Sequence, residues 1–202
     1  MKLYYDPASC ALSPHIVLRE AGLPFELERV DLAAQRTQGG ADFGAIKPKG
    51  FIPVLELDDG SRLTEGSVIV QYIADLVPEK ALIPPAGSFE RYRVQEWLSF
   101  VSAELHRGQT PLFEKTLAAD YEARVRARLG RRFAFLSDRL ATCAYLMGEA
   151  FTVADAYCFT ILNWAPYVKV DHGPWPAILA YRERVAARPA VQAAMRAEGL
   201  IA

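Results

Sequence analysis

The 202-residue chain has few cysteines, no long apolar run and no excess of one charge. Its three cysteines are an odd number, far below the density of a disulfide-rich secreted domain, which makes a reducing cytoplasm the simplest location. No apolar stretch approaches the ~18 residues that a spanning helix needs, and the N-terminal segment does not resemble a signal peptide. We therefore expect a cytoplasmic protein with no membrane partner.

The charge balance argues against a polyanionic partner. The formal net charge is −1, from 23 Lys and Arg against 24 Asp and Glu, which leaves no global field to hold nucleic acid. One basic run consists of Arg124, Arg126, Arg128, Arg131 and Arg132. Because Glu122 and Asp138 lie nearby and no aromatic residues interleave, this run favours a solvated helix face over an anion site.

The composition is that of a folded globular protein, with 51% hydrophobic and 23% charged residues. Residues 3–5 form a short apolar run, and residues 25–32 alternate apolar and polar side chains, as a strand does. Between them, Ser13 suits a helix N-cap, Pro14 the first helical position and Gly22 the left-handed residue after the end. These signals predict a βαβ unit.

A hairpin and a helix follow. Residues 54–57 and 61–64 flank an Asp-Asp-Gly turn, a strong local hairpin signal. Apolar residues then recur at helical spacing over residues 68–76. The order βαβ and then ββα predicts an α/β domain over residues 1–78.

The composition changes after residue 78. Prolines, a glycine and a serine interrupt every periodic pattern over residues 79–88, which predicts a linker. Beyond it we find no good strand, and apolar residues at intervals of three and four predict amphipathic helices over residues 92–105 and 125–140. We therefore expect an all-α C-terminal domain over residues 89–202.

Further helices are expected toward the C-terminus. Thr152 and Asp155 have the spacing of a capping box, which favours capping by Asp155 over a catalytic or metal-binding role. Two shorter helices are expected near residues 176–187 and 190–199.

Cys10 is the residue best suited to chemistry. It precedes the first helix in a C-x-x-S arrangement with Ser13, where unpaired N–H groups and the helix dipole favour a thiolate. Because Ser13 replaces a resolving cysteine, oxidation would end in a mixed disulfide with a small external thiol. A small buried side chain is the alternative for Cys10. Packing better explains Cys143 and Cys158, and we expect His15 to be structural.

Two further segments could bind a ligand. Ile52 before Pro53 is biased toward an extended conformation and could pair its backbone with a peptide-like ligand, although a simple strand entry explains the same residues. Glu65 and Gly66 precede the third predicted helix, where backbone N–H groups can hold a carboxylate and Glu65 can accept from an ammonium. A zwitterionic amino-acid end fits both groups, and helix capping is the alternative.

Several motifs occur together with these signals, nearly from end to end of the chain. They are Lys2-Leu3-Tyr4-Tyr5, Cys10, Leu12-Ser13-Pro14-His15-Ile16-Val17-Leu18-Arg19-Glu20, Pro53-Val54-Leu55, Leu63-Thr64-Glu65-Gly66, Ile69-Val70-Gln71-Tyr72, Phe89-Glu90-Arg91-Tyr92 and Ala197-Glu198-Gly199-Leu200-Ile201. With them the chain resembles the cytosolic glutathione transferases, most closely the bacterial beta class. The resemblance implies a thioredoxin-like domain followed by a helical domain, a homodimer, glutathione as cosubstrate and no metal.

The resemblance also implies roles in the first domain. Cys10 would face the glutathione sulfur and be able to form a mixed disulfide with it. The Ile52 backbone, before a cis Pro53, would pair with the cysteinyl unit. Glu65 and Gly66 would hold the γ-glutamyl end.

In the helical domain, the resemblance places Glu104 and His106 near the active site, with His106 close to the thiol and Glu104 in a position to act across the dimer. From the residues alone, His106 is a cation stabilised at a helix end. Phe113, Trp164 and Tyr167 are candidates for an electrophile pocket, and core packing explains such aromatics equally well.

This chain departs from the beta-class pattern at four positions. It has Gln35 and Arg107 where Lys is common, Ser99 where Asn is common, and Ala11 in place of a Ser or Thr hydroxyl. Loss of Lys at position 35 removes a cation for the glycine carboxylate and would weaken glutathione binding or pass that role to neighbouring groups. Arg107 keeps the charge.

We therefore expect a glutathione transferase that conjugates glutathione to electrophilic, mostly apolar small molecules. A glutathione-dependent thiol transferase or peroxidase that uses a Cys10 mixed disulfide is one alternative. A non-catalytic relative that only binds partners is another, and the presence of Cys10, Pro53, Glu65 and His106 argues against it.

Overall fold

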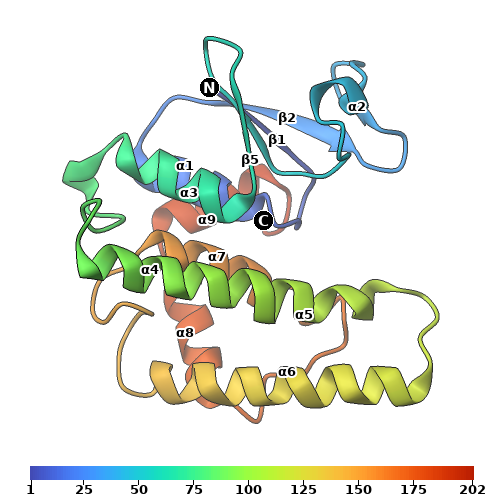
Figure 1. Ribbon diagram of the computed structural model, residues 1–202, viewed down its shortest axis with the longest axis vertical. Helices are drawn as coiled ribbons and strands as arrows, with labels where there is room; N and C mark the ends of the chain where they lie inside the picture. The colour runs from blue at the N-terminus through green and yellow to red at the C-terminus, as the bar shows by residue number, and fades with distance from the viewer. The chain divides into compact units, whose positions relative to one another are not determined.

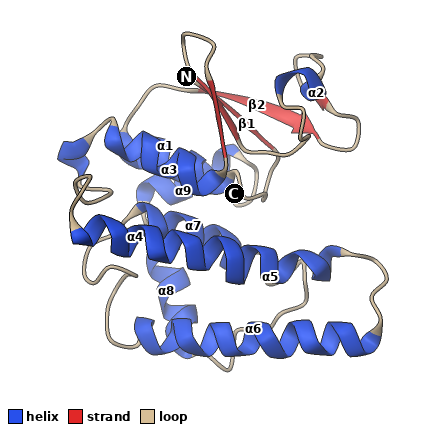
Figure 2. Cartoon of the chain, in the orientation of Figure 1, coloured by secondary structure: helices blue, strands red, loops and turns tan.

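The computed structural model describes residues 1–202, which form two compact units. Unit 1 comprises residues 1–82 and 188–202, and unit 2 comprises residues 83–187. Figure 1 and Figure 2 show that the strands belong to unit 1 and that unit 2 is built from helices and loops. The predicted succession of an α/β domain and a helical domain is confirmed.

Unit 1 contains a five-stranded mixed sheet with the order β3-β2-β1-β4-β5. The strands are β1 (Lys2–Tyr5), β2 (Glu26–Asp31), β3 (Arg36–Thr37), β4 (Val54–Glu56) and β5 (Arg62–Thr64). β1 and β2 are parallel, which confirms the βαβ unit, and every other pair is antiparallel. β4 and β5 form the predicted hairpin, in which Gly60 takes a positive φ of 82°.

The helices of unit 1 are α1 (Leu12–Ala21), α2 (Phe43–Ile46), α3 (Gly66–Asp75), the short η1 (Pro78–Lys80) and α9 (Pro189–Ala197). α1 packs against both α3 and α9, and Figure 1 shows these three helices side by side, with α2 apart from them. The periodic patterns do not predict β3 or α2, because two residues of strand and a single helical turn are too short to show a period.

The start of α1 differs from the expectation. The helix begins at Leu12, so Ser13 lies in its first turn and is not the N-cap. The Ser13 hydroxyl instead donates to the Cys10 carbonyl at 3.0 Å, which ties the first turn of α1 to the segment that precedes its N-cap residue, Ala11. The predicted left-handed residue at the other end is confirmed, since Gly22 has a φ of 70°.

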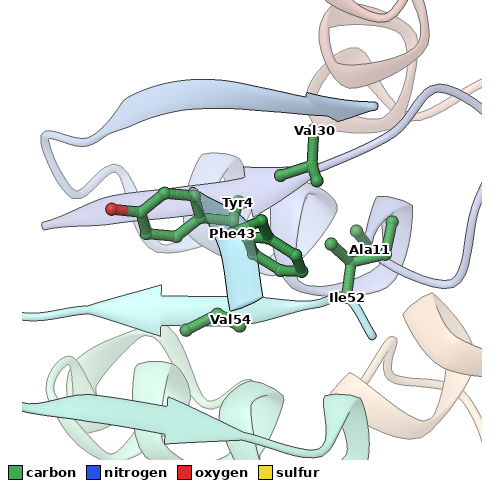
Figure 3. Packing of buried hydrophobic residues seen from close by; sticks show 6 residues of the cluster. All are labelled: Tyr4, Ala11, Val30, Phe43, Ile52 and Val54. Atoms are coloured by element: carbon green, nitrogen blue, oxygen red, sulfur yellow. The ribbon is translucent and has the colours of Figure 1, made fainter. Parts of the chain in front are cut away.

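One buried cluster joins α2 to the segments around the candidate site. Its members are Tyr4, Ala11, Val30, Phe43, Ile52 and Val54 (Figure 3). Within α2, Phe43 is fully buried as a member of this cluster, and Ile46 packs against it. Ala11 and Ile52 are the direct neighbours of Cys10 and Pro53. The core therefore fixes α2 and both candidate-site segments to the same part of unit 1.

Residues 188–202 belong to unit 1, whereas the sequence predicts that all of residues 89–202 belong to the second domain. The reason is a set of contacts between distant parts of the chain. α9 packs on α1, and the ring Nδ1 of buried His15 bonds the Glu198 carboxylate at 2.8 Å. Arg19 Nε donates to His15 Nε2 at 2.9 Å, which accounts for both ring nitrogens of that side chain. His15 therefore has the expected structural role.

Unit 2 consists of helices from residue 83 to residue 187. They are α4 (Phe89–Phe100), the π-helical η2 (Val101–His106), α5 (Arg107–Gln109), η3 (Thr110–Phe113), α6 (Ala119–Leu140), α7 (Val153–Leu162) and α8 (Pro176–Ala186). Ser88 caps α4 by accepting the Arg91 N–H at 3.2 Å. The apolar stripe predicted for residues 125–140 is the buried face of α6. No helix combines the length and apolar character that a bilayer crossing requires.

The capping box at the start of α7 is present. Asp155 Oδ2 accepts the Thr152 N–H at 2.8 Å, and its Oδ1 accepts the Leu146 N–H at 2.8 Å. The Tyr181 hydroxyl donates to the same Oδ1 at 3.1 Å. Burial raises the pKa of Asp155 to about 6, although these hydrogen bonds oppose the shift. Asp155 therefore organises the interior of unit 2.

The basic run on α6 is largely ion-paired. Arg124 pairs with Asp120 at 3.0 Å, and Arg126 pairs with Glu122 at 2.7 Å, both one helical turn apart. Arg132 bonds to the carboxylate of Glu104, which lies on η2. This arrangement agrees with the expected solvated helix face.

Candidate active site

Cys10 lies in the turn between β1 and α1. Its side chain is partly buried, and its Sγ–H donates to the Ile52 carbonyl oxygen at 3.6 Å. The thiol is therefore held against the segment that enters β4.

Burial raises the pKa of Cys10 to about 11. A backbone hydrogen bond and the charge of Lys47 lower the pKa, and the Glu65 carboxylate raises it, but burial outweighs them. The expectation of a thiolate is therefore wrong for the protein by itself. The helix start does lie beside the sulfur, yet desolvation of the anion has the larger effect, and Cys10 is a thiol at neutral pH.

Ile52 and Pro53 are joined by a cis peptide bond. The Ile52 N–H has no acceptor within the protein, and its carbonyl accepts only from the Cys10 thiol. A Cβ built on Gly66 would lie 3.6 Å from the Pro53 side chain and 3.7 Å from the Ser13 hydroxyl. The loop before β4, the start of α3 and the first turn of α1 thus meet at one place.

Glu65 precedes α3 with a φ of 69°, a conformation that is strained for a side chain with a Cβ. The residue is exposed, and no hydrogen bond or ion pair joins its carboxylate to another group of the protein. Strained residues of this kind cluster at ligand-binding sites, because the surrounding structure must hold them in place. The N–H groups of Gly66 and Ser67, at the start of α3, also have no acceptor within the protein.

Lys47 has a charge that acts on two candidate-site residues, and the sequence patterns do not reveal it. It follows α2, only 6% of its surface is exposed, and its charge acts on both Cys10 and Glu65. Gln35, which stands where the resemblance expects a lysine, donates its side-chain amide to the Leu32 carbonyl at 2.7 Å. No sequence pattern identifies Lys47, because lysines outside helices and strands are normally exposed to solvent and nothing in the sequence marks this one as buried.

The other cysteines have structural surroundings. Cys143 Sγ lies within hydrogen-bonding distance of the carbonyls of Arg139 and Tyr145, between which its single S–H is shared, and Cys158 is fully buried within α7. Burial raises the pKa of Cys158 far above its usual range. No group of three or more His, Cys, Asp or Glu side chains in the chain could hold a metal ion.

In unit 2, His106 ends the π-helical segment η2. Its Nδ1 bonds the Tyr157 hydroxyl at 2.7 Å, and its ring meets Trp164 edge-on with 4.7 Å between centroids. Burial, with help from the Arg107 charge, lowers the pKa of His106 to about 4. His106 is therefore neutral at physiological pH, contrary to the expectation of a cation at a helix end.

The remaining candidates of unit 2 divide into two places. Phe113 packs edge-on against Trp164 with 5.1 Å between centroids, so these two aromatics and His106 form one cluster. Tyr167 is 60% exposed and lines a cavity of about 440 Å³ whose walls are largely polar and charged. The Glu104 carboxylate accepts a hydrogen bond from Arg132 Nε at 2.6 Å. It is not a member of the cluster formed by His106, Phe113 and Trp164.

Two family descriptions match the chain. The description "Glutathione S-transferase, N-terminal domain" matches residues 8–76, and "Glutathione S-transferase, C-terminal domain" matches residues 96–189. Among curated relatives, the glutathione S-transferase GstA of Escherichia coli O157:H7 is 46% identical over 99% of this chain and 100% of its own length.

Solved structures agree with the family descriptions. A sphingomonad glutathione S-transferase complexed with glutathione has a TM-score of 0.95 at 43% identity and covers 100% of both chains. The bacterial beta-class glutathione S-transferase of Sphingomonas chungbukensis has a TM-score of 0.95 at 40% identity, again over 100% of both chains. With both halves matched and relatives this similar along their whole length, the chain belongs to the glutathione S-transferase family, among its bacterial beta-class members.

Proposed function

We propose that the protein conjugates glutathione to electrophilic, mostly apolar small molecules. In a displacement, the glutathione thiolate attacks a carbon that carries a halide, the C–S bond forms, and the halide leaves with the bonding electron pair. In an addition, the thiolate attacks an activated double bond and a proton from solvent completes the product. Family membership and the sphingomonad complex with glutathione support this cosubstrate.

The free polar groups of unit 1 match the chemistry of glutathione. The unpaired N–H of Ile52 and its carbonyl suit the cysteinyl backbone, as when a strand is added to a sheet edge. The Glu65 carboxylate suits the α-ammonium of the γ-glutamyl end. The N–H groups of Gly66 and Ser67 suit the α-carboxylate of the same end.

The protonated Cys10 thiol is the observation that carries the choice of conjugation. A thiol with a pKa of about 11 is a poor nucleophile at neutral pH but a competent S–H donor. In the structure it donates to the Ile52 carbonyl. When the cysteinyl unit of glutathione occupies that backbone, the same S–H can donate to the glutathione sulfur, which favours its thiolate form.

We assign supporting roles to unit 2. His106, neutral and held by Tyr157, is the second proposed catalytic residue, as a hydrogen-bond partner that carries no charge. Following the resemblance, Glu104 is proposed as a further glutathione-binding residue. Phe113 and Trp164 are proposed to line the electrophile pocket together, and the polar surroundings of Tyr167 make it the least suitable of the three aromatics.

We also propose a homodimer in a reducing cytoplasm. The beta-class resemblance supports the dimer, and three free cysteines are compatible with a reducing compartment. Sedimentation velocity at micromolar protein tests the assembly, and a monomer throughout that range would refute it.

Two measurements test the conjugation activity. Calorimetric titration with glutathione should show binding, and the protein should accelerate conjugation of 1-chloro-2,4-dinitrobenzene at neutral pH. Absence of binding at millimolar glutathione would refute the proposal.

Cys10→Ala separates conjugation from thiol transfer. We expect the variant to retain conjugation at a rate reduced about 10- to 150-fold, because one hydrogen bond to a charged sulfur is worth about 1.5–3 kcal/mol. Part of the lost rate should return at higher pH. Exchange with a glutathione mixed disulfide should be lost. Disulfide exchange that exceeds conjugation in the unmodified protein would instead make it a thiol transferase.

A further inference from the structure

Glu198, near the end of the chain, contacts the turn that carries Cys10. It follows α9, its side chain is fully buried, and the two oxygens of its carboxylate have different partners. Oε2 accepts the Ala8 N–H at 3.2 Å, and Oε1 lies 2.8 Å from Nδ1 of buried His15. One carboxylate thus bonds the chain two residues before Cys10 and five residues after it.

Arg19 determines the direction of the bond between His15 and Glu198. A guanidinium can only donate, and Arg19 Nε lies 2.9 Å from His15 Nε2, so Nε2 accepts and the ring proton is on Nδ1. The Nδ1–H therefore donates to Glu198. This bond fixes the carboxylate to α1 and holds its second oxygen at the Ala8 N–H.

Residues 6–9 form a turn that does not suit alanine. The Ser9 N–H donates to the Asp6 carbonyl at 3.1 Å, Pro7 is the second residue of the turn, and Ala8, the third, has a φ of 62°. A positive φ at the third residue is typical of a type II turn, in which glycine or asparagine is the usual residue there. The Ala8 backbone is therefore strained, and contacts outside the turn must hold it in place.

The bond to Glu198 selects this turn over the type I form, which suits alanine. The two forms differ by a flip of the peptide that carries the Pro7 carbonyl and the Ala8 N–H. In the type I form the Pro7 carbonyl would face the Glu198 carboxylate, and two acceptors would meet without a proton between them. Because Glu198 accepts the Ala8 N–H, it favours the left-handed conformation of Ala8.

The backbone between Ala8 and α1 is itself held by hydrogen bonds. The Ser9 side chain accepts the Ala11 N–H at 3.2 Å, and the Ser9 carbonyl accepts the Leu12 N–H at 3.1 Å. Cys10 lies inside this bonded segment, directly after Ser9. A change of φ at Ala8 therefore moves the segment that carries the thiol.

We propose that Glu198 is a positioning residue for the Cys10 thiol. By holding Ala8 in its left-handed conformation, it keeps the sulfur buried and 3.6 Å from the Ile52 carbonyl. This inference rests on the proposed function, in which the same S–H donates to the sulfur of glutathione. It makes the residues after α9 part of what shapes the thiol site.

The test combines two measurements on Glu198→Ala. The first is alkylation of Cys10 by iodoacetamide at about pH 8 without glutathione, read by peptide mass spectrometry. The second is kcat and KM for conjugation of 1-chloro-2,4-dinitrobenzene. We expect alkylation to become about three- to tenfold faster and kcat to fall about three- to tenfold, with KM for glutathione changed less than about threefold.

Glu20→Ala is the matched control. The Glu20 carboxylate also joins α1 to the C-terminal segment, because it accepts from Arg188 Nε at 2.6 Å and from Nη2 at 2.9 Å. Its loss therefore loosens the same two segments without removing the bond to the Cys10 turn. Glu20→Ala should change the alkylation rate and kcat by less than about twofold.

Ala8→Gly separates the position of the thiol from overall stability. Glycine takes a positive φ without strain, so Ala8→Gly in the Glu198→Ala background should return the alkylation rate to within about twofold of that of the unmodified protein. Most of the loss in free energy of unfolding should remain, because the buried Nδ1–H of His15 still lacks its acceptor.

Three results would overturn the inference. They are unchanged alkylation in Glu198→Ala, an equal change in Glu20→Ala, and failure of Ala8→Gly to restore the rate. If Glu198→Ala does not fold, Glu198→Gln takes its place, and failure of both to fold would make Glu198 a structural residue only.

The two measurements also separate this inference from the function beneath it. Alkylation needs no glutathione, so it decides whether Glu198 positions the thiol even if the unmodified protein does not conjugate. Absence of conjugation by the unmodified protein would refute the proposed function alone.

Discussion

The thiol of Cys10 should titrate near pH 11 when no glutathione is added. Raising the pH deprotonates this thiol, and burial moves the pKa of that step from 9.0 to about 11. A shift of about two pKa units corresponds to roughly 3 kcal/mol of preference for the thiol over the thiolate. The protonated form is the one that the folded protein favours.

The shift predicts a slow alkylation rate. At pH 7 the thiolate fraction falls from about 1% to about 0.01%, while each thiolate becomes about eightfold more nucleophilic because nucleophilicity rises with pKa. The product of these factors is a rate roughly tenfold below that of the same cysteine in the unfolded chain. Restricted access to the sulfur lowers the rate further.

The assay is alkylation by iodoacetamide at a series of pH values, read for each cysteine by peptide mass spectrometry. The unfolded chain in urea is the reference, and circular dichroism at each pH shows that the fold persists. Lys47→Gln should move the Cys10 midpoint upward and Glu65→Gln should move it downward, because Lys47 lowers the pKa and Glu65 raises it. A midpoint below about pH 8, or alkylation at pH 7 faster than in urea, would refute the argument from burial.

The same shift has a consequence for stability. The pKa of Cys10 is higher in the folded than in the unfolded chain, so its contribution is fully present below about pH 9 and is lost as the pH rises toward about 11. Alkaline unfolding of Cys10→Ala should therefore begin at a higher pH than that of the unmodified protein.

Three further predictions concern buried groups. Glu198→Ala should lower the free energy of unfolding by about 1–3 kcal/mol in urea titrations, because it leaves the buried Nδ1–H of His15 without its acceptor; an unchanged free energy of unfolding would contradict this. Asp155→Ala should cost about 2–4 kcal/mol, since several buried donors lose their acceptor at once, and an unchanged melting temperature would contradict that role. His172→Leu should raise the melting temperature and reduce the loss of stability between about pH 6.5 and 4, because neither ring nitrogen has a partner and burial lowers the pKa of His172 to about 4; equal acid sensitivity of both proteins would speak against it.

Local chemistry predicts the elements that have strong local signals. The Asp-Asp-Gly turn predicts the β4-β5 hairpin, and the apolar spacing over residues 125–140 predicts the buried face of α6. The strand β3 and the helix α2 escape prediction because they are too short to show a period. The assignment of α9 to unit 1 depends on packing against α1, which is distant in sequence.

The candidate site is harder to predict than the fold. Cys10, Ile52 and Glu65 stand out by their neighbours in sequence, and the structure gives each of them an unpaired or unusual environment. The pKa of Cys10 cannot be predicted from the sequence, because the helix start is visible there whereas the burial of the sulfur is not. Lys47 escapes prediction for a similar reason, since its burial depends on how α2 packs.

The discontinuity of unit 1 bears on the order in which the chain can fold during synthesis. Unit 2 is one continuous stretch, residues 83–187, whereas unit 1 needs residues 188–202 before its interior is filled. The contact between buried His15 and Glu198 spans 183 positions of sequence. His15 therefore lacks its carboxylate partner until residue 198 has been synthesised. Unit 1 therefore completes its interior only after all of unit 2 has been synthesised, so the unit that is encoded first cannot finish folding before the second one has been made.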